Sequence, residues 1–528
     1  MRPPLTGALV VALVCTAVSS AAVPVAPASR GTSASAVGAP AADPTGTTTW
    51  GPTAAEVTRA DQLVADLSLN QLAGQVIVAG YRGTGSPAGL VRRLHLGGVV
   101  PVADNIVSAE QLRSVVASVQ QAARGRGYPA FVGIDQEGGR VVRVHEATPY
   151  PAFMSTGAAG RPDLTRLAAR ASAREMSGLG FTAVLAPDAD VTRGPRDPVI
   201  GTRSASEFPA QAAEQVVAAQ DGVASAGLIA TLKHFPGHGS ATVDSHLALP
   251  ELDASLEQLR ARDLVPFQAG IEAGATAVMV GHLDVRAVDP GVPASLSRKV
   301  VDGLLRGELG FEGLVLTDAL SMRAVSRHYG PAQAAVRALR AGVDVVLMPA
   351  DPEKARDGIV AAVRQGRLPR SRVEEAAARM VALLLHVRHA GVAPLDLGTS
   401  AWVSAKLSQA ALTSVSGPCQ GRLVTSRVRL RGPAAAVAAF EAAARRQGLA
   451  IGDRGTKVAL VTDRPARAGV VVALDRPEVL ARSQARVRVA TYGETPGAMN
   501  ALVAYLVGSG PAPGRLPTRT LSLPRSGC

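Results

Sequence analysis

The sequence predicts an α/β protein in which a (β/α)8 TIM-type barrel is followed by a smaller α/β sandwich domain. Eight apolar runs of strand length recur between residues 75 and 349, and stretches with helical spacing separate them. Continuous apolar strands that alternate with helices indicate a parallel sheet buried on both faces. Eight such units over about 300 residues match the barrel. The alternative is a doubly wound open sheet, but no GxGxxG motif follows the first run.

The predicted barrel strands follow one another at regular intervals. In chain order they are QVIVAG (75–80), GGVVPV (97–102), AFVGID (130–135), FTAVLAPD (181–188), LIATLKHF (228–235), AVMVGHL (277–283), GLVLTD (313–318) and DVVLMP (344–349). Between them, stretches such as 108–127 and 207–227 carry the Ala-, Leu- and Arg-rich spacing of helices. We therefore place the barrel at residues 53–394.

The pattern changes after Pro394, and 528 residues are in any case too many for one ordinary domain. Residues 395–528 predict a smaller α/β domain, with helices at 432–450 and 495–510 and strands at 458–463, 469–475 and 486–493. These strands carry no set of His and carboxylates like that of the barrel. We interpret the second domain as a layered α/β domain without catalytic residues.

The N-terminus has the pattern of a secretory signal peptide. A charged MRPP start precedes an apolar run and a zone of small residues, so we predict a signal peptide at 1–28 and a disordered linker at 29–52. Lipid anchoring at Cys15 is not favoured, because Val14 stands where a lipoprotein signal has a small residue. The expected location is secreted or associated with the cell wall.

Composition limits the partners. The net charge is +13, but Lys occurs only five times, so the charge comes from an Arg-rich composition typical of a GC-rich genome. Its functional interpretation is weak association with an anionic cell envelope. Aromatic residues are scarce at 3%, and there is no block of consecutive basic residues, so we expect no nucleic-acid partner.

Two cysteines, Cys419 and Cys528, remain after signal cleavage. In an exported chain they predict one disulfide, with two free thiols as the alternative. No CxxC motif or ordered Cys/His spacing suggests a structural zinc site.

Polar residues collect at the carboxyl ends of the predicted strands. They are Asp135, Asp188, Lys233 with His234, His282 and Asp318. In a barrel these ends share one face, where the loops build active sites. The alternative is that each residue caps the following helix, which explains one Asp better than it explains the whole set.

The stretch KHFPGHGSATVDSH (233–246) holds three of the nine His in the chain. Pro236, Gly237 and Gly239 exclude a regular helix, and a loop crowded with ionisable groups is typical of a functional site. One alternative is zinc binding by His234, His238, Asp244 and His246. Against it, the His234/His238 pair spans a Pro-Gly turn rather than a helix.

Several motifs together resemble glycoside hydrolase family 3, in its bacterial β-N-acetylglucosaminidase branch. They are GIDQEGGRVVR (133–143), IGTRS (200–204), KHFPGHG with DSH (233–246), GFEGLVLTDALSM (310–322) and, more weakly, YGETP with APGRLP in the second domain. The resemblance runs from about Gln62 to Pro517. It implies a retaining mechanism without metal or cofactor, in which a carboxylate nucleophile works with a separate acid/base.

The resemblance also implies roles for single residues. Asp318 falls on the nucleophile position, and His246 on the acid/base position, with Asp244 as the carboxylate that orients its imidazole. The implied contacts to the terminal sugar are Asp135, Arg143, Arg203, Lys233 and His234, each with salt-bridge membership as its alternative. His238 and His282 are expected to support the site. Ser240-Ala241, Ala205-Ser206 and Ala319 depart from the family pattern and leave fine specificity open.

The sequence thus predicts an exo-β-N-acetylglucosaminidase that acts on peptidoglycan fragments or related glycans. The alternatives are a family 3 β-glucosidase, an N-acetylglucosaminide phosphorylase, and a noncatalytic envelope-binding protein. The sequence leaves the oligomeric state open.

Overall fold

The computed structural model describes residues 46–241, 243–520 and 522–528. The predicted signal peptide, Cys15 and linker residues 29–45 lie outside the described residues. Residues 46–52, which the sequence assigned to the linker, include Trp50, and its side chain is buried in the barrel core. Packing on the barrel therefore starts before the expected boundary at residue 53. Among the described residues, no helix is long and apolar enough to cross a membrane.

Every predicted barrel strand is present in a parallel sheet. The strands are β1 (Ile77–Ala79), β2 (Gly98–Val99), β3 (Phe131–Ile134), β4 (Ala183–Val184), β5 (Ile229–Phe235), β7 (Ala277–Val280), β9 (Leu314–Thr317) and β10 (Val346–Leu347). They pair in the order β10-β1-β2-β3-β4-β5-β7-β9. A parallel bridge between Leu316 and Val345 joins β9 to the segment before β10 and closes the ring. The prediction of a barrel is confirmed, and the open sheet is excluded.

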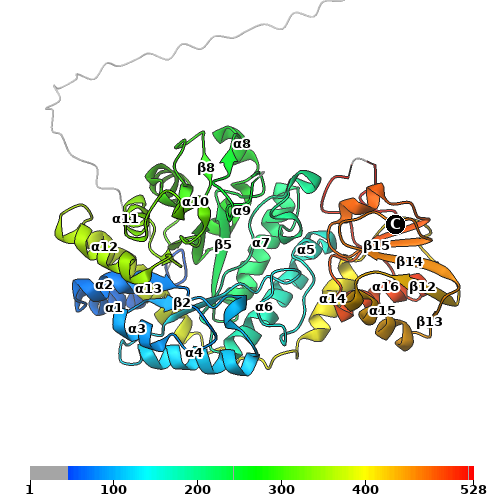
Figure 1. Ribbon diagram of the computed structural model, residues 1–528, viewed down its shortest axis with the longest axis horizontal. Helices are drawn as coiled ribbons and strands as arrows, with labels where there is room; N and C mark the ends of the chain where they lie inside the picture. The colour runs from blue at the N-terminus through cyan, green and yellow to red at the C-terminus, as the bar shows by residue number, and fades with distance from the viewer. Residues whose placement is uncertain (1–45, 242, 521) are drawn as a thin grey trace, which may run out of the picture. The chain divides into compact units, whose positions relative to one another are not determined.

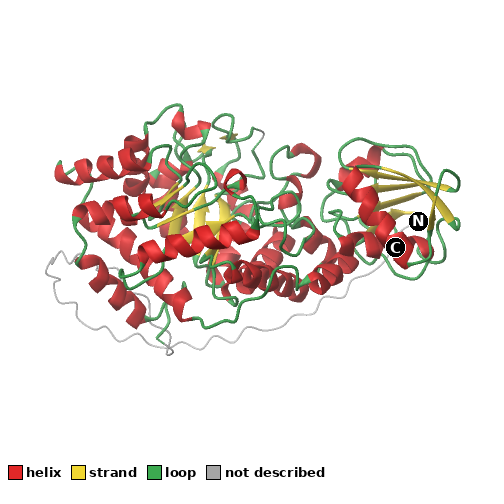
Figure 2. Cartoon of the chain, turned by 60° about the horizontal axis from the view of Figure 1, so that its bottom comes forward, coloured by secondary structure: helices red, strands yellow, loops and turns green. Residues whose placement is uncertain are grey.

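Helices surround the strands (Figure 1, Figure 2). The helices are α1 (Ala54–Ala65), α2 (Leu69–Gln75), α3 (Ala88–Leu94), α4 (Ala109–Ala123), α5 (Met154–Ala159), α6 (Pro162–Gly178), α7 (Pro209–Ala224), α8 (Leu256–Ala261), α9 (Val265–Glu272), α10 (Arg323–Ser326), α11 (Pro331–Ala341), α12 (Pro352–Arg364) and α13 (Arg370–His389). Shorter elements are η1 (Ala103–Asn105), η2 (Gly194–Arg196), η3 (Gly201–Arg203), η4 (Ala294–Leu296), the π-helical η5 (Lys299–Glu308) and the paired strands β6 (Glu251–Leu252) and β8 (Asp284–Val285).

The apolar spacing of the sequence explains this packing. In α4, the buried side chains include Leu112, Val116 and Val119, at helical intervals of three and four residues. Strand residues such as Val78 and Val132 have no exposed surface, because helices cover one face of the sheet and barrel side chains cover the other. Helix α1 begins with a capping box in which Thr53 and Glu56 accept each other's backbone N–H.

The second domain is built on one six-stranded sheet. Its elements are α14 (Ala401–Ala411), β11 (Thr413–Ser416), β12 (Arg427–Arg431), α15 (Ala434–Arg446), β13 (Ala450–Ile451), β14 (Thr456–Val461), β15 (Val470–Ala473), η6 (Pro477–Arg482), β16 (Val487–Ala490) and α16 (Pro496–Val507). The order is β11-β16-β15-β14-β12-β13, and β11 is the antiparallel member.

The two faces of this sheet belong to different apolar clusters. Val470 and Val472 pack with α15 and α16, whereas Val471 and Ala473 pack with η6 and with Met154 of α5. Alternation along β15 therefore separates the faces, as a strand requires. Cys419 and Cys528 are joined by a disulfide with a Cα–Cα distance of 5.4 Å, as the sequence predicted.

Candidate active site

Asp318 lies directly after strand β9, and its backbone N–H donates to the last residue of β7 (2.9 Å). The Ala319 N–H donates to Oδ1 of Asp318 (2.7 Å). Helix α10 has Met322 at its N-cap, so Asp318 does not cap it. Burial alone would raise the pKa of Asp318, but His282, His234 and the Ala319 N–H hold it below its usual value. Asp318 is therefore a carboxylate near neutral pH, the form that attacks as a nucleophile.

His282, after strand β7, supports the segment that follows Asp318. Its Nε2 lies 3.0 Å from the carbonyl oxygen of Ala319, and its Nδ1 lies 2.7 Å from Oγ of Ser295. A carbonyl can only accept, so Nε2 carries the proton and Nδ1 accepts from the Ser295 hydroxyl. Burial lowers the pKa of His282 and keeps the ring neutral. This geometry agrees with the supporting role predicted for His282.

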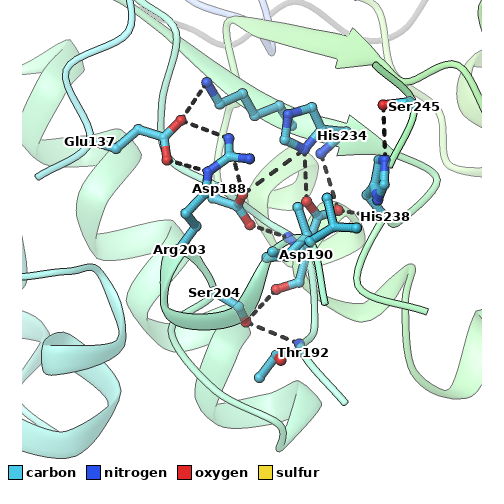
Figure 3. Close-up of polar contacts among 12 residues, drawn as sticks. Glu137, Asp188, Asp190, Thr192, Arg203, Ser204, His234, His238 and Ser245 are labelled. Atoms are coloured by element: carbon cyan, nitrogen blue, oxygen red, sulfur yellow. Dashed lines mark hydrogen bonds and ion pairs between the residues drawn. The ribbon is translucent and has the colours of Figure 1, made fainter. Parts of the chain in front are cut away.

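Glu137, which the sequence analysis did not select, is at the centre of the buried ion pairs (Figure 3). Its two oxygens accept a forked pair of hydrogen bonds from Arg203, both 2.8 Å long. The Nζ atom of Lys233 lies 2.7 Å from Oε1. Burial alone would raise the pKa of Glu137, but Arg203 and Lys233 hold it far below its usual value. In this structure Arg203 is thus a salt-bridge member, the alternative that the sequence left open.

Lys233 also pairs with Asp135, whose Oδ1 lies 2.7 Å from Nζ. Arg143 approaches the same carboxylate, with 3.9 Å between its Nη2 and Oδ2. The Lys233 side chain is 3% exposed, whereas those of Asp135 and Arg143 are 24% and 25% exposed. Asp135 and Arg143 are therefore the most exposed members of the predicted sugar-contact set.

Asp190, also absent from the predicted set, connects His234 to the loop that follows it (Figure 3). Its Oδ2 lies 2.7 Å from Nδ1 of His234, and its Oδ1 accepts the backbone N–H of His238 (2.6 Å). Burial alone would raise the pKa of Asp190, but His234 and His238 hold it below its usual value. Because this carboxylate only accepts, the proton of His234 is on Nδ1. No described residue pairs with Nε2 of His234.

Asp188 completes the cluster without a hydrogen bond at its Oδ2, which lies 3.6 Å from Nη2 of Arg203 and 4.0 Å from Nδ1 of His234. Burial, with Asp190 adding to it, raises the pKa of Asp188 well above its usual value. Asp188, Asp190 and His234 place potential ligand atoms within 4.8 Å of one another, as no other group in the described part of the chain does. That group differs from the zinc set considered from the sequence.

Asp244 and His246 form their predicted pair on an exposed loop. Nδ1 of His246 lies 2.7 Å from Oδ1 of Asp244, which also accepts the backbone N–H of His246 (2.8 Å). The two side chains are 40% and 71% exposed, with His246 the more exposed. Burial alone would raise the pKa of Asp244, but its bonds to His246 hold it below its usual value. With Nδ1–H donating to a carboxylate, Nε2 of His246 is left to exchange a proton.

The second domain, predicted to be noncatalytic, contacts the barrel segment that carries Arg203. Nη2 of Arg476 donates to the carbonyls of Gly194 (3.0 Å) and Asp197 (2.7 Å), and Thr202 hydrogen-bonds to Asp475. These bonds fix the loop that presents Arg203 to Glu137. The second domain therefore positions part of the cluster, although its own residues do not join it.

The structure brings one subset of the predicted residues together and leaves another apart. Contacts join one subset into a single cluster beside Asp318: Asp135, Arg143, Arg203, Lys233 and His234. The pair Asp244 and His246 stands on the loop. Glu137 and Asp190 were missed, yet each lies two residues after an acidic residue at a strand end. That spacing of two is the signal that points to them.

The geometry agrees with comparisons to known proteins. Residues 68–383 match the glycosyl hydrolase family 3 N-terminal domain. A beta-hexosaminidase of Stenotrophomonas maltophilia (strain K279a) is 39% identical over 279 residues, which are 51% of this chain and 81% of that protein. Beta-hexosaminidase A of Pseudoalteromonas piscicida is 36% identical over 280 residues, 49% of this chain and 47% of that protein. The chain thus spans about half the length of the second relative.

A solved structure extends the likeness into the second domain. It is a glycoside hydrolase family 3 β-N-acetylglucosaminidase from Paenibacillus sp. str. FPU-7, with a TM-score of 0.77 and 28% identity. The match covers 86% of this chain and 99% of that one. The barrel and the second domain are therefore both part of the shared architecture.

Proposed function

The chain belongs to glycosyl hydrolase family 3, and on that premise we propose that it is a retaining exo-β-N-acetylglucosaminidase. One observation carries the proposal: an ionised Asp318 at a barrel strand end occurs together with a His246 imidazole that Asp244 orients. Retaining glycosidases need such a nucleophile and a separate acid/base. The Ala324 N–H donates to the Ser245 carbonyl (3.3 Å), which ties the loop to the segment after Asp318.

In the first step, the carboxylate of Asp318 attacks the anomeric carbon of the terminal sugar and forms a glycosyl ester. The bond to the leaving oxygen breaks, and Nε2–H of His246 gives that oxygen a proton. Asp244 stabilises the imidazole in this orientation through Nδ1–H. The buried cluster holds the sugar: Asp135 accepts from its hydroxyls, while Arg143 and His234 lie at the same end of the barrel.

In the second step, the neutral His246 takes a proton from water as the water attacks the anomeric carbon. The ester to Asp318 breaks, and the released sugar keeps the β configuration. The acid of the first step is thus the base of the second.

The preference for N-acetylglucosamine is supported by the relatives, which are named as beta-hexosaminidases, and by the Paenibacillus β-N-acetylglucosaminidase. The direct experiment compares 4-nitrophenyl β-GlcNAc with 4-nitrophenyl β-glucoside, each with and without phosphate. We expect hydrolysis of the GlcNAc substrate and free GlcNAc as the product under both conditions. Preference for the glucoside would establish a β-glucosidase. GlcNAc 1-phosphate as the main product would establish a phosphorylase.

We further propose that the protein is exported and acts on peptidoglycan-derived glycans. The N-terminal MRPP start and apolar run support export, and the positive net charge of +13 suits an anionic envelope. Incubation with muropeptides that end in GlcNAc should release GlcNAc, as detected by mass spectrometry. Detection of the protein in the cytoplasmic fraction alone would contradict export.

A further inference from the structure

The loop that carries the acid/base pair is buried at only one residue. We define the acid/base loop as residues 243–248. Val243 is 41% exposed and Leu247 is 59% exposed. Between them, Ser245 is 3% exposed, although Ser is a small polar residue that usually stays at the surface. A buried Ser between two exposed partners of a catalytic pair is unexpected unless its hydroxyl has a specific contact.

Ser245 makes that contact with His238 of the barrel (Figure 3), where Oγ lies 3.1 Å from Nε2. Its carbonyl accepts the Ala324 N–H (3.3 Å). Asp244 and His246 hydrogen-bond to each other and to backbone within the loop. Within the described residues, every hydrogen bond between the acid/base loop and the rest of the chain therefore passes through Ser245.

His238 is itself held firmly by the buried cluster. Its side chain is buried, and its backbone N–H donates to Asp190 (2.6 Å). Its ring meets that of His234 edge-on, with centroids 5.8 Å apart. Because Asp190 also bonds Nδ1 of His234, the same carboxylate that orients a predicted sugar contact fixes the anchor of the loop.

We infer that Ser245 and His238 are the positioning residues of the acid/base pair. Their hydrogen bond holds His246 within hydrogen-bond reach of the leaving-group oxygen. The inference rests on the proposed function of His246. Without the bond, Asp244 and His246 remain chemically intact, but the Ser245 carbonyl contact with Ala324 alone holds the loop, and the pair is less firmly placed. Proton transfer depends on a hydrogen-bond distance between donor and acceptor, so a misplaced imidazole fails most where the leaving group needs the proton most.

The test measures kcat/KM, which reports formation of the glycosyl-enzyme, on two substrates. One is 4-nitrophenyl β-GlcNAc, whose leaving group needs little proton donation, and the other is N,N′-diacetylchitobiose, whose sugar leaving group needs it fully. Ser245→Ala should lose about tenfold on the disaccharide and less than about twofold on the aryl substrate. Ser245→Thr, which keeps the hydroxyl, should recover most of the disaccharide activity.

Leu247→Ala is the matched control, because Leu247 is exposed and in the same loop; it should leave both substrates unchanged. His238→Ala should reproduce the selective loss, although it also removes buried contacts. A merely structural role of Ser245 predicts a lower melting temperature with equal losses on both substrates. Equal losses in Ser245→Ala would therefore overturn the inference.

His246→Ala separates this inference from the proposed function. It should lose at least about 100-fold on the disaccharide and much less on the aryl substrate. In that background, Ser245→Ala should add no further selective loss, because the group it positions is absent. If His246→Ala itself shows equal losses, the proposed acid/base assignment fails. If it is selective and Ser245→Ala is not, the positioning inference alone fails.

Discussion

The buried cluster and the acid/base loop hold their polar side chains in opposite ways. Glu137 and Lys233 have side chains 4% and 3% exposed, and each is paired with charged partners from other segments of the barrel. His246 has a side chain 71% exposed and reaches the rest of the fold through its neighbour Ser245. The proposed sugar-holding side of the site is fixed by many contacts within the barrel, whereas the proposed proton-transferring side is fixed by the two hydrogen bonds of one residue, Ser245.

Mutations in the two regions should therefore differ in how they affect stability and activity. A change within the cluster removes ion pairs in a dry environment, and it should therefore weaken the fold as well as the activity. A change at an exposed residue of the loop, such as His246, removes little buried structure. It should alter activity while the free energy of unfolding stays within about 0.5 kcal/mol of the wild type.

The largest effect on activity is expected from the nucleophile. Asp318→Asn keeps the shape of the side chain and removes the attacking carboxylate, so kcat should fall by at least about 10⁴-fold on every substrate. Steady-state kinetics with the aryl and disaccharide substrates will measure it. The loss should be alike for both, unlike that of His246→Ala. Residual activity within tenfold of the wild type would remove Asp318 from the nucleophile role.

The largest effect on stability is expected at Glu137. Glu137→Gln leaves Arg203 and Lys233 buried without their shared carboxylate, which should cost about 3–5 kcal/mol of unfolding free energy. Urea denaturation will measure it. The matched control is Glu353→Gln, whose 2.8 Å pair with Arg93 is half exposed and should cost less than about 1 kcal/mol. Equal costs would contradict the contrast between buried and surface charges.

The same carboxylate predicts a pH dependence with a definite sign. The folded-state pKa of Glu137 is far below the unfolded value of 4.5, so its contribution is fully present above pH 4.5 and is lost as pH falls toward the folded value. The stability gap between wild type and Glu137→Gln should narrow below pH 4.5. Asp188 has a raised pKa, so its contribution to stability is present at low pH and is lost as pH rises through its folded value. The stability difference between the wild type and Asp188→Asn should therefore decrease as pH rises.

The eight barrel strands and the line of polar strand ends were predictable, because continuous apolar runs and their last residues are local features. Glu137 and Asp190 were not selected, because their roles depend on partners such as Arg203 and His234 that are distant in sequence. Strands β11 and β12 of the second domain were missed for another reason. Thr413–Ser416 is short and polar, and in Arg427–Arg431 each apolar residue stands between two Arg, so neither segment is a continuous apolar run.

A smaller effect is expected from the second domain. Arg476→Ala removes two hydrogen bonds to the loop that carries Arg203 and should lower kcat/KM by about threefold to tenfold, mainly through KM. Arg482→Ala is the matched control: it is exposed and makes a 3.4 Å bond to Asp463 within its own domain. If both variants behave like the wild type, the second domain does not position the cluster.

The most direct measurement traps the covalent glycosyl ester that the proposed mechanism forms on Asp318. The protein is incubated with a mechanism-based fluorinated N-acetylglucosaminyl fluoride, digested, and sequenced by tandem mass spectrometry. We expect one sugar attached to Asp318 in the wild type and in His246→Ala, because an activated fluoride leaves without a proton from His246. A sugar on another carboxylate, or no covalent adduct while the compound is turned over, would contradict it.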